Sequence, residues 1–168
     1  MAAEGTERRD AVDEAAARWA ESYPGAGGFR ALVSLVRGYA ATAREVDRLL
    51  RPVGLNMSRF ELLLLLSFTR SGALPVMRIR DLLMVHGSSV TYLVDRLAEA
   101  GWVAREDDPA DRRVSLVAIT DAGRAVVDRA AGLLADGGFG PLAGLGDDDL
   151  DALGTLLGRL RAPAQPGG

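Results

Sequence analysis

Gly87-Ser88-Ser89-Val90-Thr91-Tyr92-Leu93-Val94-Asp95-Arg96-Leu97-Ala98-Glu99-Ala100-Gly101 is the stretch that decides the fold of this 168-residue chain. Its apolar residues recur at helical spacing and form one stripe: Val90, Leu93, Val94, Leu97 and Ala98. Gly101 is suited to the left-handed conformation that ends a helix. The other face is polar toward the N-terminal end, where a helix-turn-helix protein meets the edges of bases. An ordinary solvated helix explains this segment equally well when the segment is taken alone.

A strand, a charged loop and a second strand are expected after this helix. Trp102-Val103-Ala104-Arg105 and Val114-Ser115-Leu116-Val117-Ala118-Ile119 have strand patterns, and the second alternates apolar and polar residues. Residues 106–113 between them contain Asp and Pro, which favour turns, and two arginines. An arginine at a hairpin tip fits the narrow minor groove, and a neighbouring aspartate braces its guanidinium. A loop that merely keeps the protein soluble is the alternative, but helix and hairpin together favour a reader of duplex DNA.

These segments together resemble the MarR family of bacterial winged-helix transcription regulators. The resemblance covers roughly residues 30 to 160 and is most specific in the segments 90–97 and 111–124. It implies a mainly α fold with a small β-hairpin wing (α+β), that is, a winged helix-turn-helix with N- and C-terminal dimerisation helices. The DNA-binding residues that it implies on the recognition helix are Ser88, Ser89, Thr91, Tyr92 and Arg96. Those that it implies on the wing are Arg105, Arg112 and Arg113, with Asp111 orienting a wing arginine.

Three positions depart from the family pattern. Gly87 stands where relatives often have Pro or Arg, and Tyr92 stands where many have a longer polar or basic residue. Base recognition is therefore expected to be weaker or different. Arg80 lies where relatives have a small residue at the crossing of the two helices, so either its side chain extends outward or the crossing is looser.

Composition and charge suit a cytoplasmic protein. Hydrophobic residues make up 48% of the chain, yet the longest apolar run, Leu62 to Leu66, is too short to cross a bilayer, and we expect no membrane association. The net charge of −3 argues against a general binder of polyanions. Arginines nevertheless recur through the middle of the chain, and acidic residues cluster near its ends. All 20 basic residues are Arg, which reflects either a GC-rich genome or a need for bidentate phosphate contacts.

The residues for catalysis or metal binding are few. One histidine and no cysteine exclude a Cys nucleophile, a thiol redox sensor and a thiolate zinc site. His86 is expected to cap the recognition helix, and a role as a pH sensor is the less favoured alternative. We therefore expect no enzyme activity, no cofactor and no metal.

The remaining pattern gives the domain organisation. Residues 1–28 are predicted to be a helical arm and linker, with a helix from Arg8 to Ser22 and a break through Gly28, and 163–168 a flexible tail. Residues 29–162 form the MarR-type domain, with the winged helix-turn-helix at about 55–120 and dimerisation helices at about 29–51 and 121–162. Ser58-Arg59-Phe60-Glu61 has the pattern of a capping box. Thr120 and Asp147 are expected to begin the last two helices.

The resemblance also implies a mechanism. A homodimer would bind a pseudo-palindromic double-stranded operator, most simply as a repressor, and a small aromatic or phenolic acid would release it. Tyr39, Phe60 and Trp102 are candidates to line the ligand site, although such residues more often belong to a core. The overall acidity and the departures at Gly87 and Tyr92 motivate an alternative, a winged-helix protein-protein interaction module without DNA binding.

Overall fold

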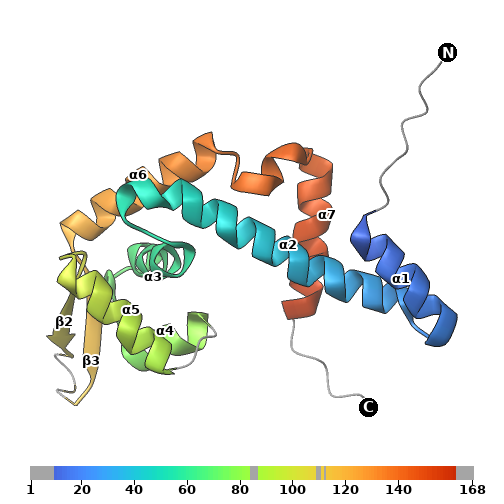
Figure 1. Cartoon of the computed structure of the whole chain (residues 1–168). Helices are drawn as coiled ribbons and strands as arrows, with labels where there is room; N and C mark the ends of the chain where they lie inside the picture. The colour runs from blue at the N-terminus through green and yellow to red at the C-terminus, as the bar shows by residue number, and fades with distance from the viewer. Residues whose placement is uncertain (1–9, 84–86, 109–110, 112, 162–168) are drawn as a thin grey trace. The chain divides into compact units, whose positions relative to one another are not determined.

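The computed structural model describes residues 10–83, 87–108, 111 and 113–161, with only the backbone at 87 and 88. In chain order its elements are α1 (Ala11–Ser22), α2 (Ala26–Leu50), η1 (Arg51–Val53), α3 (Met57–Phe68), β1 (Ala73–Pro75), α4 (Val76–Leu83), α5 (Gly87–Glu99), β2 (Val103–Asp107), β3 (Ser115–Ile119), α6 (Asp121–Asp136), η2 (Gly140–Gly144) and α7 (Asp147–Arg161) (Figure 1). A mostly helical chain with a small antiparallel sheet confirms the predicted fold class. The chain forms two compact units that divide between Arg44 and Glu45, inside α2.

The first unit contains α1 and most of α2. Val12 and Ala16 are the buried residues of α1. The Trp19 ring stacks on Phe29 with 4.4 Å between ring centroids, and its Nε1 donates to the Pro24 carbonyl at 2.8 Å. These contacts fix the turn between the two helices. The break expected through Gly28 is shorter than predicted, because α2 already begins at Ala26.

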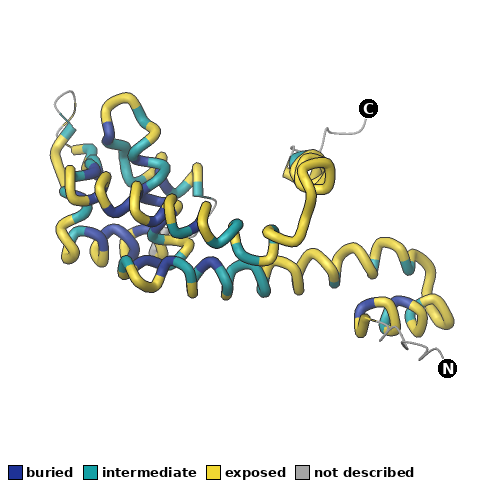
Figure 2. The backbone as a smooth tube through the Cα atoms, turned by 90° about the horizontal axis from the view of Figure 1, so that it is seen from above, coloured by how far each residue is buried: buried dark blue, intermediate teal, exposed yellow. Residues whose placement is uncertain are grey.

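The second unit has its core around α3. Leu62, Leu63 and Leu66 of this helix are completely buried. Figure 1 shows α3 between α6 and the α4–α5 pair, and α3 contacts all three of these helices. The buried segments of this unit are dark blue in Figure 2. The block Leu62 to Leu66, apolar almost all round, therefore forms a central helix as its composition predicted.

The start of α3 differs from the prediction. The N-cap residue is Asn56, whose Oδ1 accepts from the backbone N–H of Arg59 at 3.0 Å. The Met57 N–H donates to Asp47 Oδ1 at 2.8 Å. The helix therefore begins before Ser58, and the capping box predicted at Ser58 is wrong, because that residue already lies within the first turn.

The sheet contains one strand more than expected. β2 and β3 form the predicted hairpin, with Arg105 opposite Val117, and β1 pairs with the other edge of β3, with Ala73 opposite Ala118. The order is β1-β3-β2, so β2 is an edge strand. We call residues 103–119, which comprise β2, β3 and their connection, the wing hairpin.

Backbone hydrogen bonds join the wing hairpin to its neighbouring helices. Gly101 has φ of 72°, the left-handed conformation expected after α5, and Trp102 follows it into β2. Thr120 caps α6 as predicted, since its Oγ1 accepts from the Gly123 N–H at 3.0 Å and donates to the Gly101 carbonyl at 2.8 Å. One threonine therefore holds the end of α5 and the start of α6 together.

Candidate nucleic-acid interface

The recognition helix, α5, has one buried face and one exposed face. Val90, Val94 and Leu97 are fully buried in the core of the second unit. Ser89, Thr91 and Tyr92 are exposed on the same helix. The side chain of Ser88 and the whole of His86 lie outside the described residues. The apolar stripe predicted from the sequence is therefore buried, and the polar side of α5 is accessible to a ligand as large as DNA.

Tyr92 and Arg96 form a pair on this exposed face. The guanidinium carbon of Arg96 lies 5.5 Å from the centroid of the Tyr92 ring, within the range of a cation-π interaction. The Arg96 guanidinium also pairs with Glu99 one turn further along, at 2.8 Å. Glu99 was not among the predicted site residues, although its i,i+3 spacing from Arg96 is a signal for such a pair. Arg96 is therefore held over an aromatic ring and beside a carboxylate.

Arg105 is also paired. Its Nη2 donates to Asp95 Oδ1 at 2.7 Å, which joins β2 to α5. The sequence suggested Arg105 as a wing residue that contacts DNA and did not identify Asp95. The two residues are ten positions apart on different elements, so only the folded arrangement reveals the pair.

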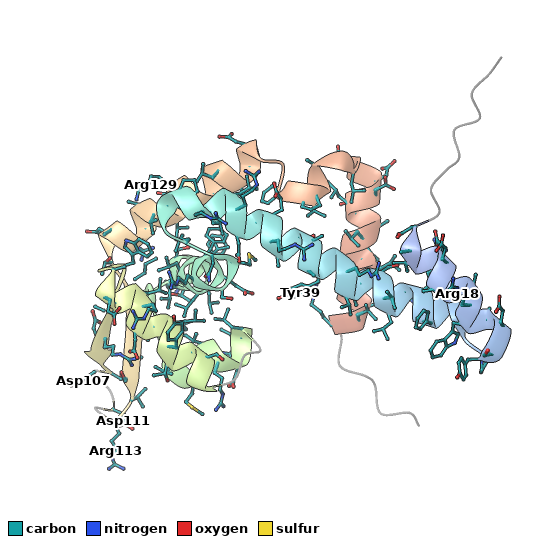
Figure 3. The ribbon with its side chains drawn as sticks, viewed as in Figure 1. Arg18, Tyr39, Asp107, Asp111, Arg113 and Arg129 are labelled. Carbon is teal, nitrogen blue, oxygen red and sulfur yellow. The ribbon has the colours of Figure 1, made fainter. Side chains whose placement is uncertain are left out.

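The tip of the wing hairpin presents Arg113. This side chain is exposed, extends away from the body of the second unit, and forms no ion pair with any other described residue (Figure 3). Asp111 Oδ1 accepts from the backbone N–H of Arg113 at 3.0 Å, and the Asp111 carbonyl accepts from Val114 N–H at 2.9 Å. The carboxylate of Asp111 thus stabilises the turn that contains Arg113. Arg112 lies outside the described residues.

Arg80 extends outward. Ile79 is the buried residue of α4, whereas the Arg80 side chain is 38% exposed and pairs with Asp81 at 3.1 Å. Of the two alternatives raised by the sequence, the structure shows the outward side chain.

The three candidate ligand-lining residues have different surroundings. Phe60 is buried in the core cluster of the second unit, and Trp102 packs against that cluster while remaining half-buried. Tyr39 is in the first unit and is 75% exposed. Phe60 therefore has the core role that was the alternative for all three.

Two carboxylates outside α5 and the wing hairpin have shifted pKa values. Three hydrogen bonds from Arg48 lower the pKa of Glu45, and partial burial raises the pKa of Glu61 on α3. Within the described part of the chain, no cluster of three or more potential metal-binding side chains occurs. None of the described helices has both the length and the hydrophobicity that a membrane crossing requires.

Comparison with known proteins identifies the family. A MarR family model matches residues 53–114, which include α3 and most of the wing hairpin. The regulator MhqR of Bacillus subtilis is 32% identical over 91 residues, which are 54% of this chain and 61% of MhqR. The chain thus spans less than two thirds of that relative.

Solved structures extend the match over more of the chain. The MarR family regulator Sco5413 of Streptomyces coelicolor is 38% identical, with a TM-score of 0.77 over 83% of this chain and 96% of Sco5413. Sco3205 of the same organism, solved in complex with DNA, is 25% identical, with a TM-score of 0.72 over 82% of this chain and 90% of Sco3205. All three are transcriptional regulators, which fits the expectation that this chain is not an enzyme. The chain belongs to the MarR family of transcriptional regulators, which are DNA-binding winged-helix proteins.

Proposed function

We propose that this protein is a homodimeric repressor that binds a pseudo-palindromic operator, with α5 in the major groove and the wing hairpin in the adjacent minor groove. The observation that supports this most directly is the joint exposure of Thr91, Tyr92 and Arg113 on α5 and the hairpin tip. Hydroxyl groups suit hydrogen bonds to base edges, and an arginine suits the negative potential of a minor groove. A repressor that occludes a promoter needs no chemistry beyond this binding.

The homodimer is supported by apolar residues that remain exposed in the part of one chain that the structure describes. Leu32, Val36 and Tyr39 follow one face of α2 and are 60%, 59% and 75% exposed. The same stripe continues at helical spacing to Val46 and Leu50, which are buried in the core of the second unit. The apolar face of α2 is therefore buried near the C-terminal end of the helix and exposed toward its N-terminal end.

The last helix has a similar stripe. Leu150, Leu153 and Leu160 of α7 are 36%, 36% and 69% exposed, at a spacing that places them on one side of the helix. We propose that the stripes on α2 and α7 are covered by a second copy of this chain. The dimerisation surfaces would then lie on α2, within the segment 29–51, and on α7, within the segment 121–162.

Arg113→Ala tests the DNA-binding proposal. We expect affinity for a duplex selected by the protein from a random-sequence pool to fall about 10-fold. The slope of log K against log salt concentration should become shallower by about 1.8, because each of the two subunits loses one phosphate-region contact, worth about 0.9. The measurement is a fluorescence-anisotropy titration at several salt concentrations.

Arg129→Ala is the matched control for this titration. Arg129 is an exposed arginine on α6, and Figure 3 shows it well away from the hairpin tip. Both variants lose the same charge, so only position distinguishes them. Equal affinities and slopes for the two variants would contradict the wing assignment. Selection of no duplex by the wild-type protein would favour a protein-protein interaction module instead.

We further propose that a small aromatic acid weakens operator binding, with Trp102 as a contact residue. Trp102 packs against the core of the second unit and is only half-buried. Buried Phe60 is omitted from this proposal. Phenolic acids added to the titration above should raise the dissociation constant of the wild-type protein, and no change with any compound would refute the idea.

A further inference from the structure

The ion pair between Asp95 and Arg105 joins the two DNA-reading elements. Asp95 is on α5, Arg105 is on β2, and the Arg105 Nη2 to Asp95 Oδ1 distance is 2.7 Å. The side chains are 50% and 41% exposed, so the contact adds little to the free energy of unfolding. The same contact also constrains the orientation of β2 relative to α5, and this constraint is distinct from its contribution to stability.

The position of Arg105 along the hairpin makes that orientation important. Val103, at the start of β2, is buried, whereas Glu106 and Asp107 further out are exposed. β2 is an edge strand of the sheet. Nearer the tip, backbone hydrogen bonds join the two sides of the hairpin, such as that from the Asp108 N–H to the Val114 carbonyl at 3.0 Å. Among the described residues, Arg105 is the outermost side chain of the hairpin with an ion pair to α5.

The same pair makes Arg105 a poor phosphate ligand. Its guanidinium faces a carboxylate, so the two charges largely cancel before any DNA arrives. A phosphate bound by Arg105 would lie close to the Asp95 carboxylate, whose negative charge repels it. Arg113 differs, because no described residue forms an ion pair with it.

We propose that Arg105 is a positioning residue, and that its ion pair with Asp95 fixes the wing hairpin relative to the recognition helix so that both enter their grooves together. This inference rests on the proposed DNA-binding function. Its physical basis is preorganisation, since a hairpin that is already oriented loses less conformational freedom when it binds.

Asp95→Asn and Arg105→Gln test the proposal together. Each should weaken binding to the selected duplex about 10-fold, and the double variant should be no weaker than either single one. The salt slope should remain that of the wild-type protein in all three. Asp95→Asn is decisive because it removes a negative charge near DNA, so a phosphate-binding Arg105 would make this variant bind equally well or more tightly.

Two outcomes would overturn the proposal. One is a slope that becomes shallower by about 1.8 in Arg105→Gln, as in Arg113→Ala, which would make Arg105 of each subunit a phosphate ligand. The other is unchanged affinity in both single variants.

A measurement without DNA separates this proposal from the proposed function. Amide hydrogen exchange in β2 and β3 of the free protein should be faster in both single variants, while the melting temperature stays within about 2 °C of wild type. If the wild-type protein selects no duplex, the proposed function fails. Hydrogen exchange then still tests whether the Asp95–Arg105 ion pair holds the wing hairpin to α5. Unchanged hydrogen exchange in both variants would refute the positioning role. A large fall in melting temperature would also refute it, because the ion pair would then stabilise the whole fold.

Discussion

Val36→Glu is expected to convert the dimer to a monomer and to weaken binding to the selected duplex more than about 100-fold. Val36 is 59% exposed at the middle of the uncovered stripe on α2. In the proposed dimer, each copy would bury a carboxylate among apolar side chains without a partner, which costs several kcal/mol. A monomer would then contact only one half-site. Sedimentation velocity measures the first effect and a DNA titration the second.

Ser34→Glu provides the control on the same helix. Ser34 is exposed two residues before Val36, and this spacing places it on the opposite side of α2. It introduces the same charge and should leave the dimer intact. A Val36→Glu protein that still sediments as a dimer would contradict the proposed interface. A wild-type protein that sediments as a monomer would contradict the dimer itself.

Gly123→Ala is expected to lower the free energy of unfolding by about 3 kcal/mol. A Cβ atom at this position would clash with the Trp102 carbonyl oxygen and would lie 2.8 Å from the Ile119 side chain. That carbonyl accepts a hydrogen bond from Thr120 N–H at 3.0 Å, so it cannot move away without loss of a backbone contact. The glycine allows the first turn of α6 to approach the base of the wing hairpin.

Gly132→Ala in the same helix is the matched comparison. Apart from the neighbouring residues and backbone of α6 itself, no described atom lies within 4 Å of a Cβ built at Gly132, so this change should stabilise α6 by about 0.5–1 kcal/mol. Urea unfolding measures both variants. Stabilisation by Gly123→Ala, or equal effects of the two substitutions, would show that the close packing at Trp102 is not a constraint.

Elements with local signals were predicted from the sequence. The periodicity of α2 and α5, the glycine at the end of α5 and the threonine cap of α6 are all present, because each depends on residues within a few positions. The start of α3 was misplaced because Asn56 and Ser58 are both acceptable caps. The contact of Met57 N–H with Asp47, which anchors the actual start, comes from a different helix.

Features that depend on distant pairing could not be predicted in this way. β1 has three residues, too few for a recognisable alternation, and it forms by pairing with β3, far along the chain. The exposed polar residues of α5 and the exposed arginine of the hairpin tip were expected from spacing and turn chemistry. The pairing of Arg105 with Asp95 was not, since an arginine in a basic hairpin has the same sequence signature whether it binds DNA or a carboxylate.

The central claim is that two copies of α5 and of the wing hairpin read one duplex. Hydroxyl-radical footprinting on the selected duplex tests it most directly. We predict two protected regions related by two-fold symmetry, with recognition-helix centres about one helical turn apart. Each region should include minor-groove protection that disappears in Arg113→Ala. A single unsymmetrical region, or minor-groove protection that survives the loss of Arg113, would contradict this account.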